Sequence, residues 1–357
     1  MDPGLLARLA ERPPGRILVV QTAYLGDTVF SSALVSGLVA RFPGAPVDLC
    51  VSPRGRDVAR AMPGVAEVVV FDKSGADRGA TGLRRLARLL QGRSHGLAVL
   101  PHRSLRTALL AKTAGIPERL GFRSAASRVL CTATVPDPGG PFLAREAALL
   151  AALGAQPGPL RLQPREEDRV AAAAAIARLG LEGKRLVALA IGSEWATKIW
   201  PVEQFAALAA RLHQRGYSPL LLGGPRDTAV AAELQRRAGV PCADTTGNPI
   251  GEALGLLERS LLCIGGDTGL VHAARALGVP TVPIFGPTDP RLHAFGPADL
   301  AQWLHLDCAP CGPHGHRRCP LGHHRCLRDL APERVLEAAV VLLTRGGGAA
   351  AASAVPG

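Results

Sequence analysis

The chain has 357 residues, of which 47% are hydrophobic and 20% are charged, so it is globular rather than disordered and long enough for two ordinary domains. No apolar run reaches the roughly 18 residues that a membrane span needs, and the first residues lack a signal-peptide pattern, so we expect a cytoplasmic protein. The net charge of +12 lies mostly in residues 1–158, which hold 20 Lys and Arg against 11 Asp and Glu; this excess indicates either an anionic partner or an arginine-rich surface.

Short apolar runs alternate with longer helical stretches along the first half of the chain. This alternation is typical of a parallel sheet with helices on both faces. In chain order the pattern predicts a strand at 16–21, a loop at 22–28, a helix at 28–42, strands at 45–52 and 65–72 with a short helix near 56–61, a helix at 82–92 and a strand at 96–102.

The same alternation starts again after a proline-rich segment at 154–164. We therefore expect an α/β protein of two Rossmann-like, doubly wound domains, at 1–158 and 159–345, followed by a disordered tail at 346–357. The second domain is predicted to hold helices at 169–181, 202–216, 227–239 and 269–278, and strands at 185–193, 218–224, 261–266 and 281–286.

Loops that follow strands are the places to look for a site, because ligands of open α/β sheets bind beyond the carboxyl ends of the strands. Asp27 lies in the loop after the first strand, where it is either a helix cap or a general base for an incoming hydroxyl. No G-x-G-x-x-G follows that strand and no P-loop is present, which argues against a dehydrogenase and a P-loop kinase.

Two later loops carry groups suited to an anionic ligand. Ser193 and Lys198 follow the strand at 185–193, and a lysine there is either solvated or neutralises a phosphate. The segment "GGDTGLVH" opens a helix whose N-terminus offers N–H donors to a diphosphate. Asp267 in that segment is either the N-cap or a contact for sugar hydroxyls, and His272 is either a ligand contact or a buried histidine.

Four cysteines with C-x₂-C-x₇-C-x₆-C spacing lie near the end of the second domain: Cys308, Cys311, Cys319 and Cys326. Their side chains are the ligand set of a structural zinc, and an iron–sulfur cluster is also conceivable. The spacing is not that of a standard zinc ribbon, so reduced structural cysteines are the alternative.

These segments, in this order, resemble the ADP-heptose:lipopolysaccharide heptosyltransferases, and within that family the heptosyltransferase II enzymes. The resemblance runs from "ILVVQTAYLGDTVF" through "TKIWPVEQFAALAARL" and "GGPRD" to "GGDTGLVHAARALGVPTVPIFGPTDP" and "CPLGHHRCL". It implies the GT-B fold, with domain 1–158 binding the acceptor and domain 159–345 binding the nucleotide sugar across a cleft.

The resemblance also implies roles for residues of this chain. Asp27 matches the general base of an inverting transfer, and Lys198 matches the lysine that contacts the donor phosphates. The donor-binding positions are Ser193, Asp227, Gly266, Asp267, Thr268, Gly269 and His272. The candidates for acidic groups of the acceptor are Arg54, Arg56, Arg103, Arg106, Arg119 and Arg123.

The implied partners are ADP-heptose, the heptosyl-Kdo₂-lipid A acceptor of the lipopolysaccharide inner core, and the anionic surface of the inner membrane, at whose cytoplasmic face the protein would lie. Helix amides and a lysine can replace a divalent ion, so we expect no catalytic cofactor. Nucleic acid is not an expected partner, because only 4% of the residues are aromatic. The alternatives are a transferase with another donor or acceptor, a sugar-nucleotide 2-epimerase, and a non-catalytic basic protein.

Overall fold

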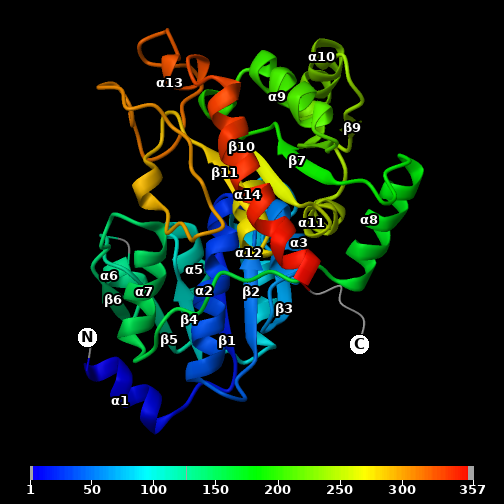
Figure 1. Cartoon of the computed structure of the whole chain (residues 1–357). Helices are drawn as coiled ribbons and strands as arrows, with labels where there is room; N and C mark the ends of the chain where they lie inside the picture. The colour runs from blue at the N-terminus through cyan, green and yellow to red at the C-terminus, as the bar shows by residue number, and fades with distance from the viewer. Residues whose placement is uncertain (1–2, 126, 353–357) are drawn as a thin grey trace. The chain divides into compact units, whose positions relative to one another are not determined.

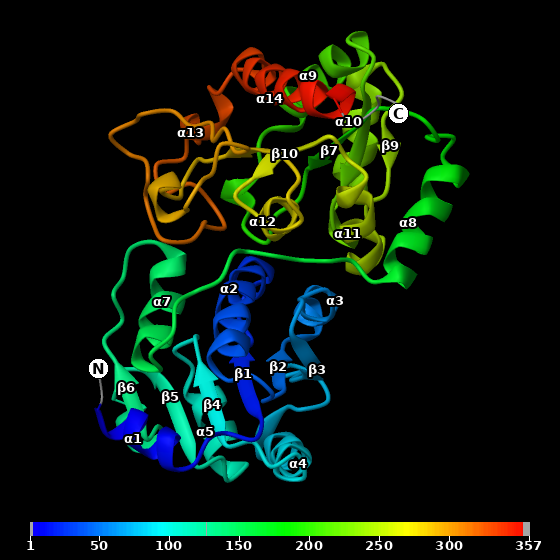
Figure 2. The same cartoon turned by 60° about the horizontal axis from the view of Figure 1, so that its bottom comes forward.

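The computed structural model describes residues 3–125 and 127–352. The chain divides into two compact units, Met1–Gln163 and Pro164–Gly357, which we call the N-terminal and C-terminal units. Each unit is built around its own parallel sheet (Figures 1 and 2).

The sheet of the N-terminal unit has six parallel strands in the order β3-β2-β1-β4-β5-β6. The central strands are buried on both faces, which explains why they read as unbroken apolar runs rather than as alternating ones. The strands are β1 (Ile17–Gln21), β2 (Val47–Val51), β3 (Val65–Val70), β4 (Leu97–Leu100), β5 (Glu118–Phe122) and β6 (Ala133–Val135).

Helices cover both faces of this sheet. Leu18 and Val20 of β1 pack with apolar side chains of α4 and α5, and α2 lies on the opposite face, where it contacts α3 and α7. The helices are α1 (Pro3–Glu11), α2 (Leu25–Arg41), α3 (Arg56–Arg60), α4 (Gly79–Gln91), α5 (Leu105–Thr113), α6 (Ser127–Leu130) and α7 (Phe142–Ala152).

The sheet of the C-terminal unit has five parallel strands in the order β11-β10-β7-β8-β9. The strands are β7 (Leu186–Ala190), β8 (Ser218–Leu222), β9 (Ala243–Asp244), β10 (Leu262–Gly266) and β11 (Thr281–Ile284), and the helices are α8 (Glu166–Arg178), α9 (Val202–Gln214), α10 (Thr228–Ala238), α11 (Ile250–Glu258), α12 (Gly269–Ala276), α13 (Arg325–Arg328) and α14 (Pro332–Ala352).

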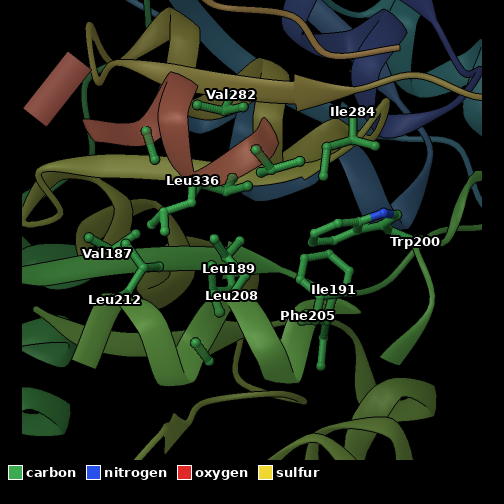
Figure 3. Close-up of a cluster of buried hydrophobic side chains, with 14 of the residues drawn as sticks. Val187, Leu189, Ile191, Trp200, Phe205, Leu208, Leu212, Val282, Ile284 and Leu336 are labelled. Carbon is green, nitrogen blue, oxygen red and sulfur yellow. The ribbon is translucent and has the colours of Figure 1, made fainter. Parts of the chain in front are cut away.

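An apolar core of this unit lies between the sheet and the helices α9, α10 and α14 (Figure 3). Trp200 is fully buried in it, stacks edge-on against Phe205 at 5.0 Å, and donates its indole N–H to the carbonyl of Leu330 at 3.2 Å. The loop that carries Lys198 is therefore anchored two residues later by the bulkiest side chain of the core.

The predicted fold class, an α/β protein with two doubly wound units, is confirmed. The first helix was expected from residue 28, but α2 begins at Leu25, so Asp27 lies in its first turn rather than in a loop. The helix α14 continues to Ala352 and so covers the first part of the segment 346–357 for which the sequence predicts disorder. Residues 353–357 of that segment lie outside the described residues.

Among the described residues, none of the helices combines the length and the apolar character that crossing a bilayer requires.

Candidate functional site

Each sheet reverses its strand order at one point, and the loops at these points carry the predicted site residues. In the N-terminal unit the reversal lies between β1 and β4, and Asp27 follows β1. In the C-terminal unit it lies between β7 and β10, and these strands lead into the loops with Lys198 and Asp267. Such switch points are where open α/β sheets bind ligands.

Asp27 is half-buried at the third position of α2. Its Oδ2 accepts the backbone N–H of Tyr24 at 3.1 Å, so the predicted cap is present. Within the described part of the chain nothing hydrogen-bonds to the other oxygen, Oδ1. The carboxylate can therefore cap the helix with Oδ2 and still accept a proton on Oδ1, so the two roles predicted for Asp27 are compatible.

A second acid near Asp27, Glu146 on α7, was not identified from the sequence. Its side chain is buried, and its Oε1 accepts the Ser31 hydroxyl at a long 3.4 Å. Burial raises the pKa of Glu146 to about 8, the Ser31 hydrogen bond lowers it, and the charge of Asp27 raises it further. Only its place in the fold reveals this acid, because "AREAALL" reads as an ordinary helix.

The six candidate acceptor arginines have different surroundings. Arg56 pairs with Asp57, and Arg103 pairs with Asp137. Arg54 is exposed in the loop after β2, and Arg123 is exposed at the end of β5. Arg106 and Arg119 bond mainly to backbone carbonyls.

The prediction for Arg119 needs correction. This residue lies near the amino end of β5, whereas the candidate site residues follow the carboxyl ends of their strands. Its guanidinium donates to the carbonyls of Ile116, Pro117 and Leu130. These bonds give Arg119 a structural role, because they hold the segments before and beside β5, and we leave it out of the proposed site.

A buried ion pair forms the centre of the C-terminal unit's site. Asp267, directly after β10, is only 7% exposed, and its Oδ2 accepts Lys198 Nζ at 2.6 Å and the Thr288 hydroxyl at 2.8 Å. Its Oδ1 lies 2.9 Å from His272 Nε2. Burial alone would raise the pKa of Asp267, but the His272 hydrogen bond and the charges of His272 and Lys198 hold it well below its usual range.

This geometry corrects one prediction for Asp267. The N-cap of α12 is Thr268, because the Asp267 carboxylate is turned toward Lys198 and His272. The backbone approaches closely at this point: a Cβ on Gly266 would lie 2.4 Å from the carbonyl oxygen of Lys198. Glycine is therefore needed there, as the sequence motif implies.

His293 belongs to the same cluster and was not identified from the sequence. It lies one residue after a short 3₁₀ turn, Pro290–Leu292, and its ring stacks on that of His272 with centroids 4.7 Å apart. Burial lowers the pKa of His293 to about 3, and the neighbouring His272 lowers it further while Asp267 raises it. His293 is therefore a neutral side chain at neutral pH.

The remaining donor-binding candidates gather around the same switch point. A Cβ on Gly192 would lie 1.9 Å from Asp227 Oδ2, so Asp227 packs directly against the loop that carries Ser193. The Ser193 hydroxyl accepts the N–H of Trp195 at 3.2 Å. Burial raises the pKa of Asp227, although the N–H of Gly224 lowers it. Gly269 is the first residue of α12, next to the Thr268 cap.

The segment with the four cysteines packs against the Lys198 loop. The Thr197 hydroxyl and the backbone of His316 bond to each other at 2.6 and 2.9 Å, and His324 Nε2 lies 2.9 Å from the Thr197 carbonyl oxygen. A Cβ on Gly315 would lie 2.5 Å from Trp195 Cβ and 3.0 Å from Lys198 Cγ. This segment therefore packs along one side of the loop that carries Lys198.

The four thiols lie near one another without forming a compact ligand set. Cys326 is close enough to Cys308, Cys311 and Cys319 for each to raise its pKa, which burial, the largest cause, brings to about 11. Burial alone would raise the pKa of Cys319, but backbone N–H groups of residues 321–324 surround its thiol and lower it. Metal ligands are His nitrogen, Cys sulfur and carboxylate oxygen atoms. Within the described ranges, the only group of three or more residues with such atoms within 4.8 Å of one another is Asp267, His272 and His293.

The buried Glu146 generates a testable prediction about stability. Its pKa in the folded state is above the ordinary value of 4.5, so its contribution to stability is complete below about pH 4.5 and is lost as the pH rises through about 8. Glu146→Gln removes this dependence. Raising the pH from 5 to 9 should therefore lower the unfolding free energy of the wild type by roughly 2–4 kcal/mol more than that of the variant.

Urea titrations of both proteins at the two pH values measure this difference. The exposed Glu182→Gln serves as the control, since it removes an acid of the same type from the surface. An identical pH dependence for Glu146→Gln and the wild type would contradict the assignment.

Comparison with known proteins identifies the family. The model described as "Glycosyltransferase family 9 (heptosyltransferase)" matches residues 83–323. Lipopolysaccharide heptosyltransferase 2 of Escherichia coli (strain K12) is 27% identical over 349 residues, covering 92% of this chain and 98% of that protein.

Two solved structures share the fold over 92% of this chain. The glycosyl transferase family 9 protein from Veillonella parvula has a TM-score of 0.83 at 23% identity and is covered to 97%. The Escherichia coli ADP-heptose lps heptosyltransferase II has a TM-score of 0.75 at 26% identity and is covered to 99%. The fold is therefore that of the GT-B heptosyltransferases, and the chain belongs to glycosyltransferase family 9, the heptosyltransferases.

Proposed function

We propose that this protein is a heptosyltransferase of lipopolysaccharide core biosynthesis that moves heptose from ADP-heptose to heptosyl-Kdo₂-lipid A with inversion at the anomeric carbon. The observation that carries the proposal is the buried Lys198–Asp267 pair at the opening of α12. Family membership supports a glycosyl transfer and sets the epimerase alternative aside. The names of the relatives supply the donor and the acceptor class.

The C-terminal unit is proposed to hold the donor diphosphate. The N–H groups in the first turn of α12 have no carbonyl partner within the helix and favour an anion. Lys198 adds a full positive charge, and Asp267 fixes its position with a 2.6 Å bond. We assign Asp267 and His272 to holding this arrangement, and Ser193, Asp227, Thr268 and Gly269 to contacts with the nucleotide sugar.

The N-terminal unit is proposed to supply the base. Asp27 takes the proton of the attacking acceptor hydroxyl on its Oδ1 while the new bond forms between that oxygen and the anomeric carbon. The bond from that carbon to the diphosphate oxygen breaks, and ADP leaves with the electron pair. Lys198 and the α12 amides stabilise the negative charge that develops on the leaving group.

We propose that this chemistry needs no metal ion. The group of Asp267, His272 and His293 has the atoms to bind one, but both oxygens of Asp267 are engaged, Oδ2 by Lys198 and Thr288 and Oδ1 by His272. An ion would have to displace Lys198, which already provides the positive charge. The cysteine segment is a separate matter: Cys308, Cys311, Cys319 and Cys326 lie near one another without forming a compact ligand set, and we propose that a structural zinc would draw them together.

The charge distribution supports the anionic acceptor. The excess of Lys and Arg in residues 1–158 suits phosphates and carboxylates, and it suits attachment to the anionic surface of the inner membrane from the cytoplasm. Of the six arginines, all but Arg119 stay in the proposal as direct contacts: Arg54, Arg56, Arg103, Arg106 and Arg123. Nucleic acid is not proposed as a partner.

The role of Asp27 is tested by Asp27→Asn. The amide keeps the size of the side chain but cannot take the proton, so we expect kcat to fall by about 10²- to 10⁴-fold with the dissociation constant of ADP-heptose unchanged. Transfer assays and calorimetric binding measure the two quantities. Glu182→Gln, which converts an exposed acid without an assigned role to its amide, is the control. Full turnover by Asp27→Asn would remove Asp27 as the base.

The role of Lys198 is tested by Lys198→Ala. Loss of the ammonium should lower kcat by about 10²- to 10³-fold and raise the KM for ADP-heptose, because both the bound diphosphate and the transition state lose a positive charge. Added methylammonium should restore part of the rate, which a purely structural defect would not permit. The exposed Lys184→Ala is the control. Kinetics equal to those of the wild type would dismiss the phosphate contact.

The metal proposals are tested together on one purified sample. Elemental analysis should find about one zinc per chain, and Cys319→Ser should reduce that content. Treatment with a chelator should lower the melting temperature and leave the rate of the remaining folded enzyme unchanged. A zinc content near zero would contradict the structural site, and a rate restored only by an added divalent ion would contradict metal-independent catalysis.

A further inference from the structure

The buried acid Glu146 has no role in the proposed reaction, although it lies near the base. It is only 4% exposed on α7, which packs along α2, the helix of Asp27. Its Oε1 lies 3.4 Å from the Ser31 hydroxyl oxygen, and within the described part of the chain its Oε2 has no hydrogen-bond partner. A buried carboxylate with so few partners is costly as an ion, so the presence of an acid at this position needs an explanation.

The Ser31 hydroxyl connects Glu146 to the turn between β1 and α2. It lies 3.2 Å from the carbonyl oxygen of Asp27, one helical turn earlier, and accepts the side-chain N–H of Gln21 at 3.4 Å. Gln21 is the last residue of β1, and its Oε1 accepts the backbone N–H of Ala23 in the turn. Ser31 therefore links the end of β1 to the first turn of α2, where Asp27 lies.

The proton count at Ser31 determines which form of Glu146 fits. A serine hydroxyl has one O–H to donate and two lone pairs to accept. The Asp27 carbonyl is the nearer acceptor, and when it receives the Ser31 proton, Glu146 Oε1 can bond to the hydroxyl only by donating a proton of its own. Gln21 and Glu146 then fill the two lone pairs. All three contacts are satisfied together only when Glu146 is a neutral acid.

The charges near Glu146 agree with this form. Burial raises the pKa of Glu146 to about 8. The Ser31 hydrogen bond lowers this pKa, the charge of Asp27 raises it and the charge of Arg145 lowers it. The strands β5 and β6 also pack against α7; β6 has no charged residue, and the two charged residues of β5 are bonded to other groups, Glu118 to Arg8 and Arg119 to backbone carbonyls.

We propose that Glu146 is a positioning residue for the base: as a neutral acid it donates to Ser31, so that Ser31 holds the first turn of α2 and Asp27 is the ionised member of the two acids. An ionised Glu146 would instead compete with the Asp27 carbonyl for the single Ser31 proton, and the turn would lose that link. The proposal deepens the proposed function and rests on it for the role of Asp27 as the base.

Two substitutions separate the hydrogen bond from the bulk of the side chain. Glu146→Leu removes the donor, so kcat should fall about 3- to 10-fold, while the KM for ADP-heptose should not change, because the C-terminal unit holds the donor. Glu146→Gln keeps an N–H donor and should retain most of the rate that Glu146→Leu loses. The exposed Glu182→Gln is the control. A wild-type kcat in Glu146→Leu, or equal losses in both variants, would overturn the proposal.

The pH dependence of kcat is a readout that loss of packing alone would not change. Glu146 ionises as the pH rises through about 8, whereas the amide of Glu146→Gln stays neutral. The ratio of the wild-type kcat to that of Glu146→Gln should therefore fall about 3- to 10-fold between about pH 7 and pH 9.5. Other titrating groups affect both proteins and cancel in the ratio. A ratio that is constant, or that rises with pH, would contradict the positioning role.

A measurement without substrate separates failure of the positioning role from failure of the proposed function. The backbone N–H groups of Ala23 and Tyr24 bond to the side chains of Gln21 and Asp27, so their NMR chemical shifts report on the turn. In the wild type both signals should move with a midpoint near pH 8, and in Glu146→Gln they should not. If the wild type transfers no heptose, the proposed function fails, and these shifts decide alone. Equal pH dependence in the two proteins would refute the role of Glu146.

Discussion

The site of the C-terminal unit depends on one ion pair, between Lys198 and Asp267. A carboxylate that is only 7% exposed is strongly destabilised unless charged and polar partners replace its water. Asp267 has such partners in Lys198, Thr288 and His272. These partners come from the loops after β7 and β11 and from α12, so a single buried charge fixes the relative positions of three elements around one helix opening.

The long segment between β11 and α14 contacts both the loop that carries Lys198 and His272. It places Gly315, His316 and His324 against the loop before Lys198, and His293 against His272. Thr197 donates to and accepts from the backbone of His316, so the Lys198 loop is held by this segment as well as by Asp267. A lysine whose side chain and loop are both fixed loses little rotamer freedom when a diphosphate binds.

The sequence predicts most of the architecture, because buried parallel strands and amphipathic helices have clear periodicities. It also shows that Asp27, Lys198 and Asp267 lie in segments that follow strands, since each comes after an apolar run. It could not reveal His293 or Glu146, whose environments depend on contacts with distant segments. The prediction for Arg119 was wrong because β5 has few apolar residues, so the sequence pattern does not show that Arg119 lies near the start of a strand.

We propose that Lys198, held by Asp267, stabilises the charge of the departing ADP. A crystal structure of the protein with ADP tests this role most directly. We expect Lys198 Nζ about 2.8 Å from an oxygen of the terminal phosphate, with the diphosphate at the first turn of α12. A diphosphate bound elsewhere, with Lys198 still bonded to Asp267 alone, would contradict it.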